Sequence, residues 1–253
     1  MSRLGRAVTG GLVVVAGVAG LFFFPQTGFP QTGRAASPVL TQAETRQAEQ
    51  WLKDLGFWTG PVDGVWDEAT RHALVAFQKI QRARPTGRLT RAEHNALSMA
   101  PAGKLIRPKE KGPAHIEVDL ARQVLFLVDD EGKVGNILPI SSGNGKTFKA
   151  KGWTGEAVTP CGRFEVYARH SGWRSSELGE MHNPLYIVGG IAIHGSESVP
   201  ATPASHGCVR IPLFASAKLP KMVPKNMPVL VYGCPDDPSR LRPVQVAETV
   251  APD

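Results

Sequence analysis

The sequence predicts two domains, a small all-α three-helix unit followed by a larger, mostly-β sandwich or barrel. Two observations indicate this division. Apolar residues recur at helical spacing between positions 41 and 100, whereas positions 114–234 hold short apolar runs separated by glycine and proline. The chain has 253 residues, 42% hydrophobic and 20% charged, which is long enough for two such units. We expect a linker at 101–113 and a disordered polar tail at 235–253.

The N-terminal segment has the charge pattern of an export signal. Arg3 and Arg6 precede an uncharged, apolar stretch at 7–24. Small residues before Ala36 offer a cleavage site, but the apolar stretch lies far from it and is close to the length of a membrane-spanning helix. A cleaved signal peptide and an uncleaved membrane anchor therefore both remain open for residues 1–36. In either case we expect the body of the protein to be exported, to the periplasm or the cell wall.

The helices of the first unit are predicted from apolar spacing and from their caps. Gly56 ends the first helix, and Asp67 caps the second after a turn-rich stretch at 59–64. Thr90 and Glu93 form a capping box for the third. A bundle this small buries little surface, so it suits a docking module better than a catalyst. The apolar positions of the three helices are Ala48, Trp51, Leu52 and Leu55; Ala69, Ala73, Leu74, Ala76 and Phe77; and Leu97.

The strands of the second unit are predicted from short apolar runs. The stretch 116–120 alternates apolar and acidic residues, and 124–128 is wholly apolar, as expected of a buried strand. Residues 129–132 favour a turn after it. Further strands are expected at 137–141, 162–168, 185–188, 191–194, 209–211 and 228–232, with a short helix near 213–218.

The most reactive group of the second unit is Cys208. A cysteine attacks as its thiolate and needs a nearby base. His194 ends an apolar strand, and His206 lies two residues before the cysteine, on the same face if the chain is extended. Gly207 allows close backbone approach and leaves amides free to face an oxyanion. Arg210 shares the alternate-residue face and is able to bind a carboxylate through two hydrogen bonds.

These residues also allow other interpretations. A buried cysteine is often inert, and a lone histidine is usually structural. Two histidines and a cysteine are also able to bind zinc, but this spacing matches no common zinc site, and no cofactor is expected. The net charge of +7 suits nucleic acid, anionic lipid, an acidic polymer such as wall glycan, or solubility alone. No Lys and Arg run interleaved with aromatic residues is present, so nucleic acid is not an expected partner.

Several motifs, taken in order, resemble two known families. Ile193–Gly195 followed by Ser205–Arg210 resembles the signature of L,D-transpeptidases of the YkuD type. Thr159–Phe164 resembles the Thr-Pro-x-Gly-x-Phe strand of that family, although Cys161 departs from the usual pattern. The first unit resembles the peptidoglycan-binding domain of bacterial wall enzymes. Its matching motifs are Leu55–Phe57, Gly60–Gly64, Ala69–Thr70, Phe77–Gln78 and Thr86–Gly87, and those of the second unit also include Val118–Leu120, Gln123 and Ser141–Gly143.

The resemblance implies a role for each residue of the cysteine motif. Cys208 would be the acylated nucleophile, His194 the base, and the carbonyl of Gly195 the group that fixes the imidazole tautomer. His206 would be a further catalytic residue, next to Cys208, His194 and Gly195. The donor peptide would be positioned by His206 and bound by residues around the cysteine, with amides near the nucleophile holding the oxyanion. These binding residues are Arg210, Ser205 and Gly207.

The resemblance also implies the reaction and the domain limits. A peptidoglycan-binding domain at 41–100 would precede a catalytic domain at 114–234 that joins the third residues of two stem peptides through a thioester. Stem peptides and glycan would be the partners. Hydrolysis of the same acyl-enzyme, as in an L,D-carboxypeptidase, and a non-catalytic wall-binding role remain as alternatives. The acyl acceptor and the oligomeric state are not specified by the sequence.

The chain has three cysteines, and an odd count in an exported protein suggests one free thiol and one disulfide. If Cys208 is the free thiol, Cys161 and Cys234 form the pair. The sequence does not show whether these two lie close enough to bond, so Cys161 is either half of a bridge or a second free thiol.

Overall fold

The computed structural model describes residues 40–101 and 105–234. The segment 1–36, expected to be a signal or an anchor, and the tail 235–253 lie outside these residues, as do positions 102–104 of the expected linker. Within the described ranges, no helix is both long enough and apolar enough to cross a membrane.

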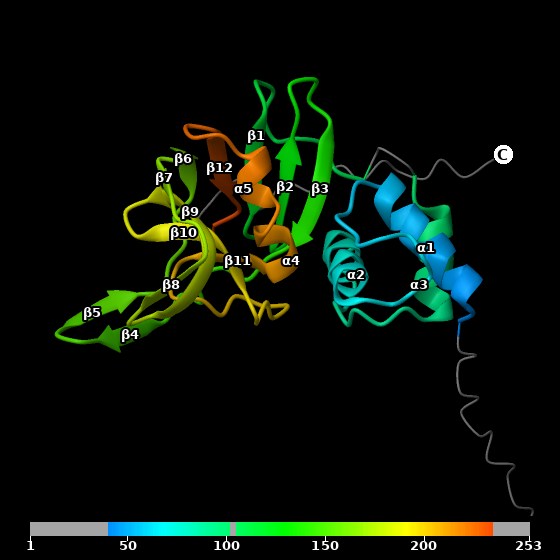
Figure 1. Ribbon diagram of the computed structural model, residues 1–253, viewed down its shortest axis with the longest axis horizontal. Helices are drawn as coiled ribbons and strands as arrows, with labels where there is room; N and C mark the ends of the chain where they lie inside the picture. The colour runs from blue at the N-terminus through cyan, green and yellow to red at the C-terminus, as the bar shows by residue number, and fades with distance from the viewer. Residues whose placement is uncertain (1–39, 102–104, 235–253) are drawn as a thin grey trace, which may run out of the picture. The chain divides into compact units, whose positions relative to one another are not determined.

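The first unit contains the three predicted helices (Figure 1). Asp67 caps the second helix, and Thr90 and Glu93 form the predicted capping box of the third. The first helix begins earlier than its apolar spacing suggests, because Thr41 and Glu44 form another capping box. The helices are α1 (Gln42–Asp54), α2 (Glu68–Ile80) and α3 (Arg91–Met99).

The second unit is mostly β, as predicted. One sheet has the strand order β3-β2-β1-β12-β6, a second has β11-β10-β9-β7 with β8 paired to β9, and β4 and β5 form a hairpin that projects from the unit (Figure 1). The strands are β1 (His115–Asp119), β2 (Val124–Val128), β3 (Val134–Pro139), β4 (Thr147–Ala150), β5 (Trp153–Glu156), β6 (Gly162–Glu165), β7 (Ala168–Arg169), β8 (Trp173–Ser176), β9 (Gly179–Val188), β10 (Ile191–Ser196), β11 (Val209–Pro212) and β12 (Pro228–Tyr232). Two short helices, α4 (Leu213–Ser216) and α5 (Leu219–Met222), precede β12.

Some elements differ from the prediction. The strand expected at 162–168 is two strands, β6 and β7, which belong to different sheets. The strands β4, β5 and β8 were not predicted. None of their residues is buried, and each strand has only two residues on either face, so β5 and β8 show no apolar alternation and the alternation of β4 is only four residues long.

The two main sheets enclose the first hydrophobic core. Ile116 and Leu125 from one sheet meet Leu185, Ile193 and Val209 from the other, and all five are buried. This arrangement is the face-to-face packing of a β-sandwich.

A second core lies between the helices and the outer face of the β3-β2-β1 sheet. Val124, Phe126 and Val128 of β2 pack here with Leu52 of α1 and Phe77 of α2. Leu125 and Leu127 point the other way, into the first core. The apolar run at 124–128 is therefore buried on both faces of the sheet, one against strands and one against helices.

Candidate active site

Two neighbouring strands of the second sheet, β10 and the terminal strand β11, bring the sequence motifs together. β10 and β11 are parallel, and His194 lies opposite Arg210 in their register. Cys208 immediately precedes β11, so it lies beside the start of β10, where the Ala192 amide donates to its Sγ at 3.4 Å. Ser141 pairs with Arg210 on the other side of β11. Residues separated by up to 69 positions are thus held on adjacent backbone segments.

A cavity of about 900 Å³ opens over these strands. Cys208, His194, His206 and Arg210 all line it. Its walls come from the β4–β5 hairpin and from β8 with the first half of β9. Large aromatic side chains of these walls face the cavity, namely Phe148, Trp153 and Trp173. The sequence prediction missed these walls, because exposed aromatic residues carry no spacing signal.

The thiol of Cys208 is free, whereas the other two cysteines are bonded to each other. Its Sγ accepts from the Ala192 amide and lies 3.8 Å from the Gly190 carbonyl oxygen. Burial raises the pKa of this thiol, and the Ala192 amide and the charge of Arg210 oppose that rise. The group is therefore a protonated thiol at neutral pH and needs a base to become a nucleophile.

His194 is the candidate base of the site. Its side chain is 4% exposed, and Nδ1 lies 2.9 Å from the Gly195 carbonyl oxygen. A carbonyl only accepts, so Nδ1 carries the proton and Nε2 keeps a free lone pair. Burial is the main cause that lowers the pKa of this imidazole to about 4; the Gly195 carbonyl opposes the shift, and the charge of Arg210 makes a smaller contribution to it. The imidazole is therefore neutral near pH 7 and is able to accept a proton.

The Ser205–Gly207 segment forms a turn that supports the cysteine. The Ser205 hydroxyl donates to the Cys208 carbonyl oxygen at 2.5 Å and accepts from the Gly207 amide at 3.0 Å. This hydroxyl, on a residue that is 2% exposed, is thus committed to the turn. The Gly207 amide is also engaged, which leaves the Cys208 amide as the expected oxyanion donor. Thr159 Oγ1 donates to the Gly207 carbonyl oxygen at 2.6 Å, a contact that the motif alone did not reveal.

His206 does not share a strand face with Cys208, so that expectation was wrong. β11 begins only at Val209, and Gly207 has φ +131°, which turns the chain between the two side chains. The exposed ring of His206 instead packs edge-on against Phe148, with ring centroids 4.9 Å apart. It lines the cavity beside Phe148 of the β4–β5 wall.

Arg210 presents a guanidinium without a protein partner. In the described parts of the chain, its side chain makes no ion pair or hydrogen bond, although its backbone pairs with Ser141. The side chain is half-buried and lines the cavity, so it is free to bind an anionic group of a ligand.

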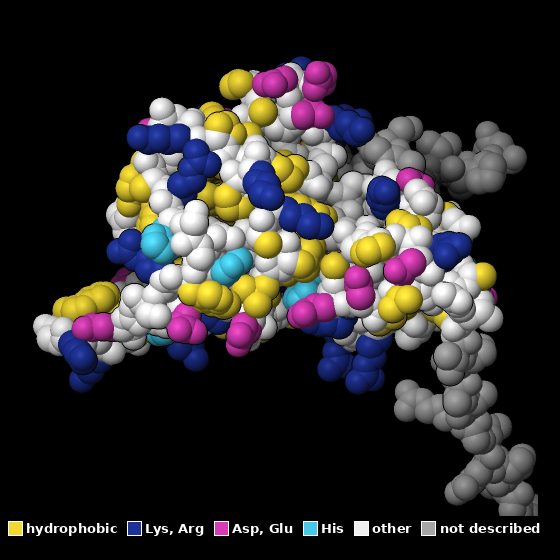
Figure 2. Space-filling view, viewed as in Figure 1, with side chains coloured by type: hydrophobic (Ala, Val, Ile, Leu, Met, Phe, Trp, Pro, Cys, Tyr) yellow, Lys and Arg dark blue, Asp and Glu magenta, His cyan; other side chains and the backbone are white. Residues whose placement is uncertain are grey.

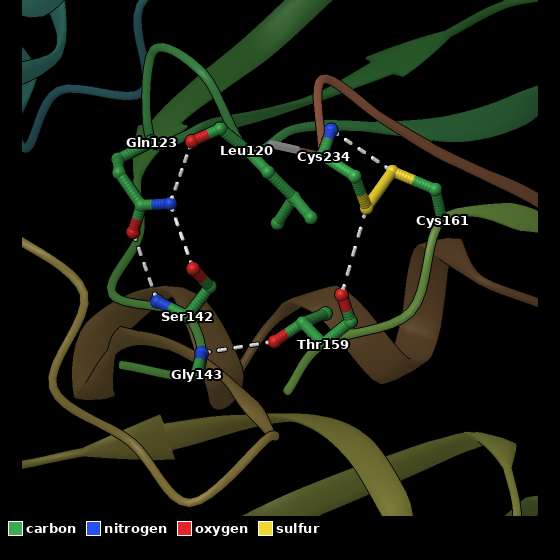
Figure 3. Close-up of a disulfide and its surroundings, with 7 residues drawn as sticks. All are labelled: Leu120, Gln123, Ser142, Gly143, Thr159, Cys161 and Cys234. Carbon is green, nitrogen blue, oxygen red and sulfur yellow. Dashed lines mark hydrogen bonds between the residues drawn. A yellow bond between two sulfur atoms is a disulfide. The ribbon is translucent and has the colours of Figure 1, made fainter. Parts of the chain in front are cut away.

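A disulfide joins Cys161 and Cys234, whose Cα atoms are 6.0 Å apart, and so settles the open pairing. It lies next to Thr159, the residue whose hydroxyl donates to the Gly207 carbonyl oxygen in the turn before Cys208 (Figure 3). Thr159 Oγ1 accepts from the Gly143 amide at 2.9 Å, and the Thr159 carbonyl oxygen lies 3.8 Å from Cys234 Sγ. The bridge therefore braces the segment that holds the Gly207 carbonyl.

Two further observations bear on the ligands of the protein. Within the described ranges, no three or more His, Cys, Asp or Glu residues are grouped to hold a metal ion. On the face shown in Figure 2, Lys and Arg side chains lie in separate groups with Asp and Glu among them. That face carries no continuous basic stripe of the kind that follows a nucleic-acid backbone.

Comparison with known proteins assigns each of the two units to a protein family. Residues 113–231 match the L,D-transpeptidase catalytic domain, YkuD, and residues 41–97 match a peptidoglycan-binding domain. The crystal structure of an L,D-transpeptidase from Xylanimonas cellulosilytica is 39% identical, with a TM-score of 0.68 over 75% of this chain and 93% of that chain. The chain belongs to the L,D-transpeptidase family. Its catalytic domain is the mostly-β unit, and its peptidoglycan-binding domain is the helical one.

Other similarities are more distant or shorter. An L,D-transpeptidase from Stackebrandtia nassauensis is 21% identical, with a TM-score of 0.43 over 76% of this chain and 90% of that chain. The localization factor PodJL of Caulobacter vibrioides is 36% identical over 80 residues, which are 31% of this chain and 8% of PodJL. The L,D-transpeptidase thus matches less than a tenth of the length of that curated relative.

Proposed function

We propose that this protein forms 3-3 cross-links in peptidoglycan through a thioester on Cys208. The observation that carries the proposal is the pairing of two groups in one cavity. The free thiol of Cys208, just before β11, lines the same cavity as a neutral His194 on the neighbouring strand β10, and the Gly195 carbonyl holds the Nδ1 proton of that histidine. Such a base is ready to take a proton on Nε2, as the histidine of a nucleophilic triad does.

In the first half of the reaction, the Cys208 thiol gives its proton to His194 and Sγ attacks the carbonyl carbon of the third stem residue. The oxyanion that forms is stabilised by the Cys208 amide. The tetrahedral intermediate collapses, the bond to the terminal D-Ala breaks, and the leaving amine takes the proton from His194. The product is a thioester and free D-Ala.

In the second half, the side-chain amine of a neighbouring stem attacks the thioester carbonyl carbon and gives its proton to His194. Collapse of this intermediate breaks the C–S bond and forms an amide between the two third residues. The leaving sulfur regains the proton from the imidazolium, which restores the starting state.

Two features of the cavity support transfer of a peptide rather than of a smaller group. The Arg210 side chain has no ion-pair or hydrogen-bond partner among residues 40–101 and 105–234, so it is placed to bind a carboxylate of the donor stem. Phe148, Trp153 and Trp173 offer apolar walls that limit the water near the thioester. We therefore favour an amine over water as the acceptor.

We assign residues 41–100 to wall binding and 114–234 to catalysis, joined by the linker 101–113. We also propose that the body of the protein acts outside the cytoplasm. The Cys161–Cys234 disulfide supports this location, because such bonds persist in oxidising compartments. The charged and apolar N-terminus agrees with export, by a cleaved signal or by an anchor.

The proposal is tested with the purified protein and muropeptides that carry tetrapeptide stems. Mass spectrometry should detect dimers joined through their third residues, and Cys208→Ala should lower their formation by at least about 10⁴-fold, because the nucleophile is lost. A carbapenem, which acylates nucleophiles of this kind, should add to the wild-type protein at Cys208 and not to the variant.

Three outcomes separate the alternatives. Free tripeptide without dimers would identify a hydrolase that uses the same acyl-enzyme. Products that survive Cys208→Ala would show that another residue is the nucleophile. Binding to wall sacculi without any product, from the folded wild-type protein, would indicate a non-catalytic wall-binding role.

A further inference from the structure

Lys79 on α2 is a buried cation that contacts the catalytic domain. The residue is 7% exposed, and its Nζ donates to the Gln123 carbonyl oxygen at 3.1 Å and the Ile140 carbonyl oxygen at 2.9 Å. In the described ranges it makes no ion pair with a carboxylate. Burial lowers the pKa of this amine to about 7.

The ammonium group is not needed to fill this space. A buried charge without a carboxylate partner is costly, and an unbranched apolar side chain of similar length would pack there without that cost. What the amine adds is a pair of directional hydrogen bonds from a rigid helix to two chosen carbonyls. It therefore fixes the position of these carbonyls relative to α2.

The two carbonyls belong to one hydrogen-bonded hub. The Ile140 amide donates to the Gln123 carbonyl oxygen at 3.0 Å. Lys79 therefore binds at the point where the segment around Gln123 and the segment around Ile140 are already hydrogen-bonded to each other. The Gln123 side chain then holds Ser142 from both ends, donating to Oγ at 2.7 Å and accepting from the amide at 2.9 Å (Figure 3). Residues 140 and 142 are thus tied to the same glutamine.

The residues that follow Ile140 carry the active site. We call 140–144 the scaffold segment. Ser141 exchanges two backbone hydrogen bonds with Arg210, at 3.1 and 3.0 Å. The Ser142 carbonyl oxygen accepts from the Ser205 amide at 2.9 Å. The Gly143 amide donates to Thr159 Oγ1, and the Thr159 hydroxyl donates to the carbonyl oxygen next to Cys208.

We propose that Lys79 is a positioning residue for acyl transfer, through which the peptidoglycan-binding domain completes the active site of its neighbour. By holding the Gln123 and Ile140 carbonyls, it sets the place of the scaffold segment, and with it Arg210 and the turn before Cys208. The proposal rests on the proposed function of Cys208, and it does not depend on the acyl acceptor.

The test compares Lys79→Met with the wild type in cross-linking of tetrapeptide muropeptides. Methionine keeps the apolar stem and removes both hydrogen bonds. We expect kcat to fall about tenfold and KM for the donor to rise, because both the nucleophile turn and Arg210 shift. Binding to wall sacculi should be unchanged. Lys53→Met, an exposed position on α1, is the matched control and should leave both constants unchanged.

A purely structural role of Lys79 predicts a different result. Loss of folded protein lowers the apparent kcat and leaves KM unchanged. Titration of reactive Cys208 with a carbapenem gives the concentration of active protein, by which the apparent kcat is corrected. If the corrected kcat and the KM of Lys79→Met both equal those of the wild type, the proposal is wrong. Failure of the proposed function is separate, because it would appear as an inactive wild type.

A double-mutant cycle with Gln123→Asn adds a second test. Asparagine tolerates the positive φ of 56° at this position, but it is too short to hold Ser142. If Lys79 acts through this hub, the two substitutions together should cost clearly less than the product of their separate effects. Effects that multiply independently would contradict the proposal.

Discussion

At the scale of single residues, the cavity favours a neutral thiol and a neutral imidazole over an ion pair. Burial raises the pKa of Cys208 and lowers that of His194 to about 4, so both shifts oppose a thiolate–imidazolium pair. Arg210 lowers the pKa of both groups, but it is a smaller cause than burial. In the mechanism we propose, the proton would therefore move to His194 only when the thiol attacks, as in general-base catalysis.

This protonation state predicts an unusual pH profile. The active form needs neutral His194, whose pKa lies below its ordinary value, so activity should persist as pH falls and be lost only near pH 4. An unperturbed histidine would lose activity near pH 6.5. The rate of Cys208 alkylation by iodoacetamide should keep rising above pH 8. The rates of carbapenem acylation and of alkylation, each followed between pH 3.5 and 9.5, measure the acid limit set by His194 and the alkaline limit set by Cys208.

Arg210→Met sharpens this prediction. Without the cation, the pKa of His194 and that of Cys208 should both rise, so both limits move to higher pH. KM for the donor should increase on the order of 10- to 100-fold if Arg210 binds its carboxylate. Arg174→Met is the matched control, because Arg174 lines the same cavity but lies over the Tyr186 ring. Equal shifts in both variants would contradict the assignment to Arg210.

At the scale of elements, the contact between β10 and α4 explains why the residue after the base is glycine. A Cβ at Gly195 would lie 2.0 Å from Ser216 Oγ and 2.6 Å from Ser216 Cβ. That hydroxyl is held by the Leu213 carbonyl oxygen and by His182 Nδ1, so it has no free direction in which to move. Ser216 of α4 thus leaves no room for a side chain on the residue whose carbonyl orients His194.

Gly195→Ala should therefore displace β10 and with it His194. We expect a loss of stability of about 1–3 kcal/mol from overpacking and a loss of acylation rate on the order of 100-fold from the misplaced base. Chemical unfolding and carbapenem acylation measure the two effects. Gly135→Ala is the control, since a Cβ there meets no atom within 4 Å.

The overlap of the Cβ added by Gly195→Ala with Ser216 Oγ and its overlap with Ser216 Cβ are separable by substitutions at Ser216. Ser216→Ala in the Gly195→Ala background removes only Oγ and should not restore activity, because Cβ still overlaps. Ser216→Gly removes both atoms and should restore part of it. Restoration by Ser216→Ala alone would show that the overlap with Oγ is sufficient to cause the loss, and restoration by neither change would show that the overlap is not the cause.

The sequence predicts buried elements well, because burial leaves a periodic pattern. The three helices and the apolar strands near 116–128 were found in this way. The strands β4, β5 and β8 were not, because Trp153 and Trp173 are exposed and follow no alternation. The support of Gly207 by Thr159 also escaped prediction, since it joins residues 48 positions apart.

At the scale of the whole molecule, the peptidoglycan-binding domain is part of the fold of the catalytic domain. The sequence suggested a separable docking module. The structure instead buries Phe57 and Phe77 of the helical domain in one core with Phe126 and Ile137 of the sheet. The Gly56 carbonyl oxygen and the Trp58 amide pair with the backbone of Ile137, so the sheet edge is also shared.

A shared core predicts that the two domains of the folded body unfold together. Phe77→Ala on α2 should destabilise the protein by about 3–5 kcal/mol, because it leaves a cavity among large side chains. The melting temperature of the whole molecule should then fall by roughly 6–20 °C in a single calorimetric transition. Phe164 borders the core between the sheets, and Phe164→Ala should lower the temperature of the same transition.

If Phe77→Ala shifts an early, separate transition and leaves the main one unchanged, the domains are independent. In that case Lys79 would have no rigid frame from which to hold the scaffold segment, so cooperative unfolding is the condition on which its positioning role depends.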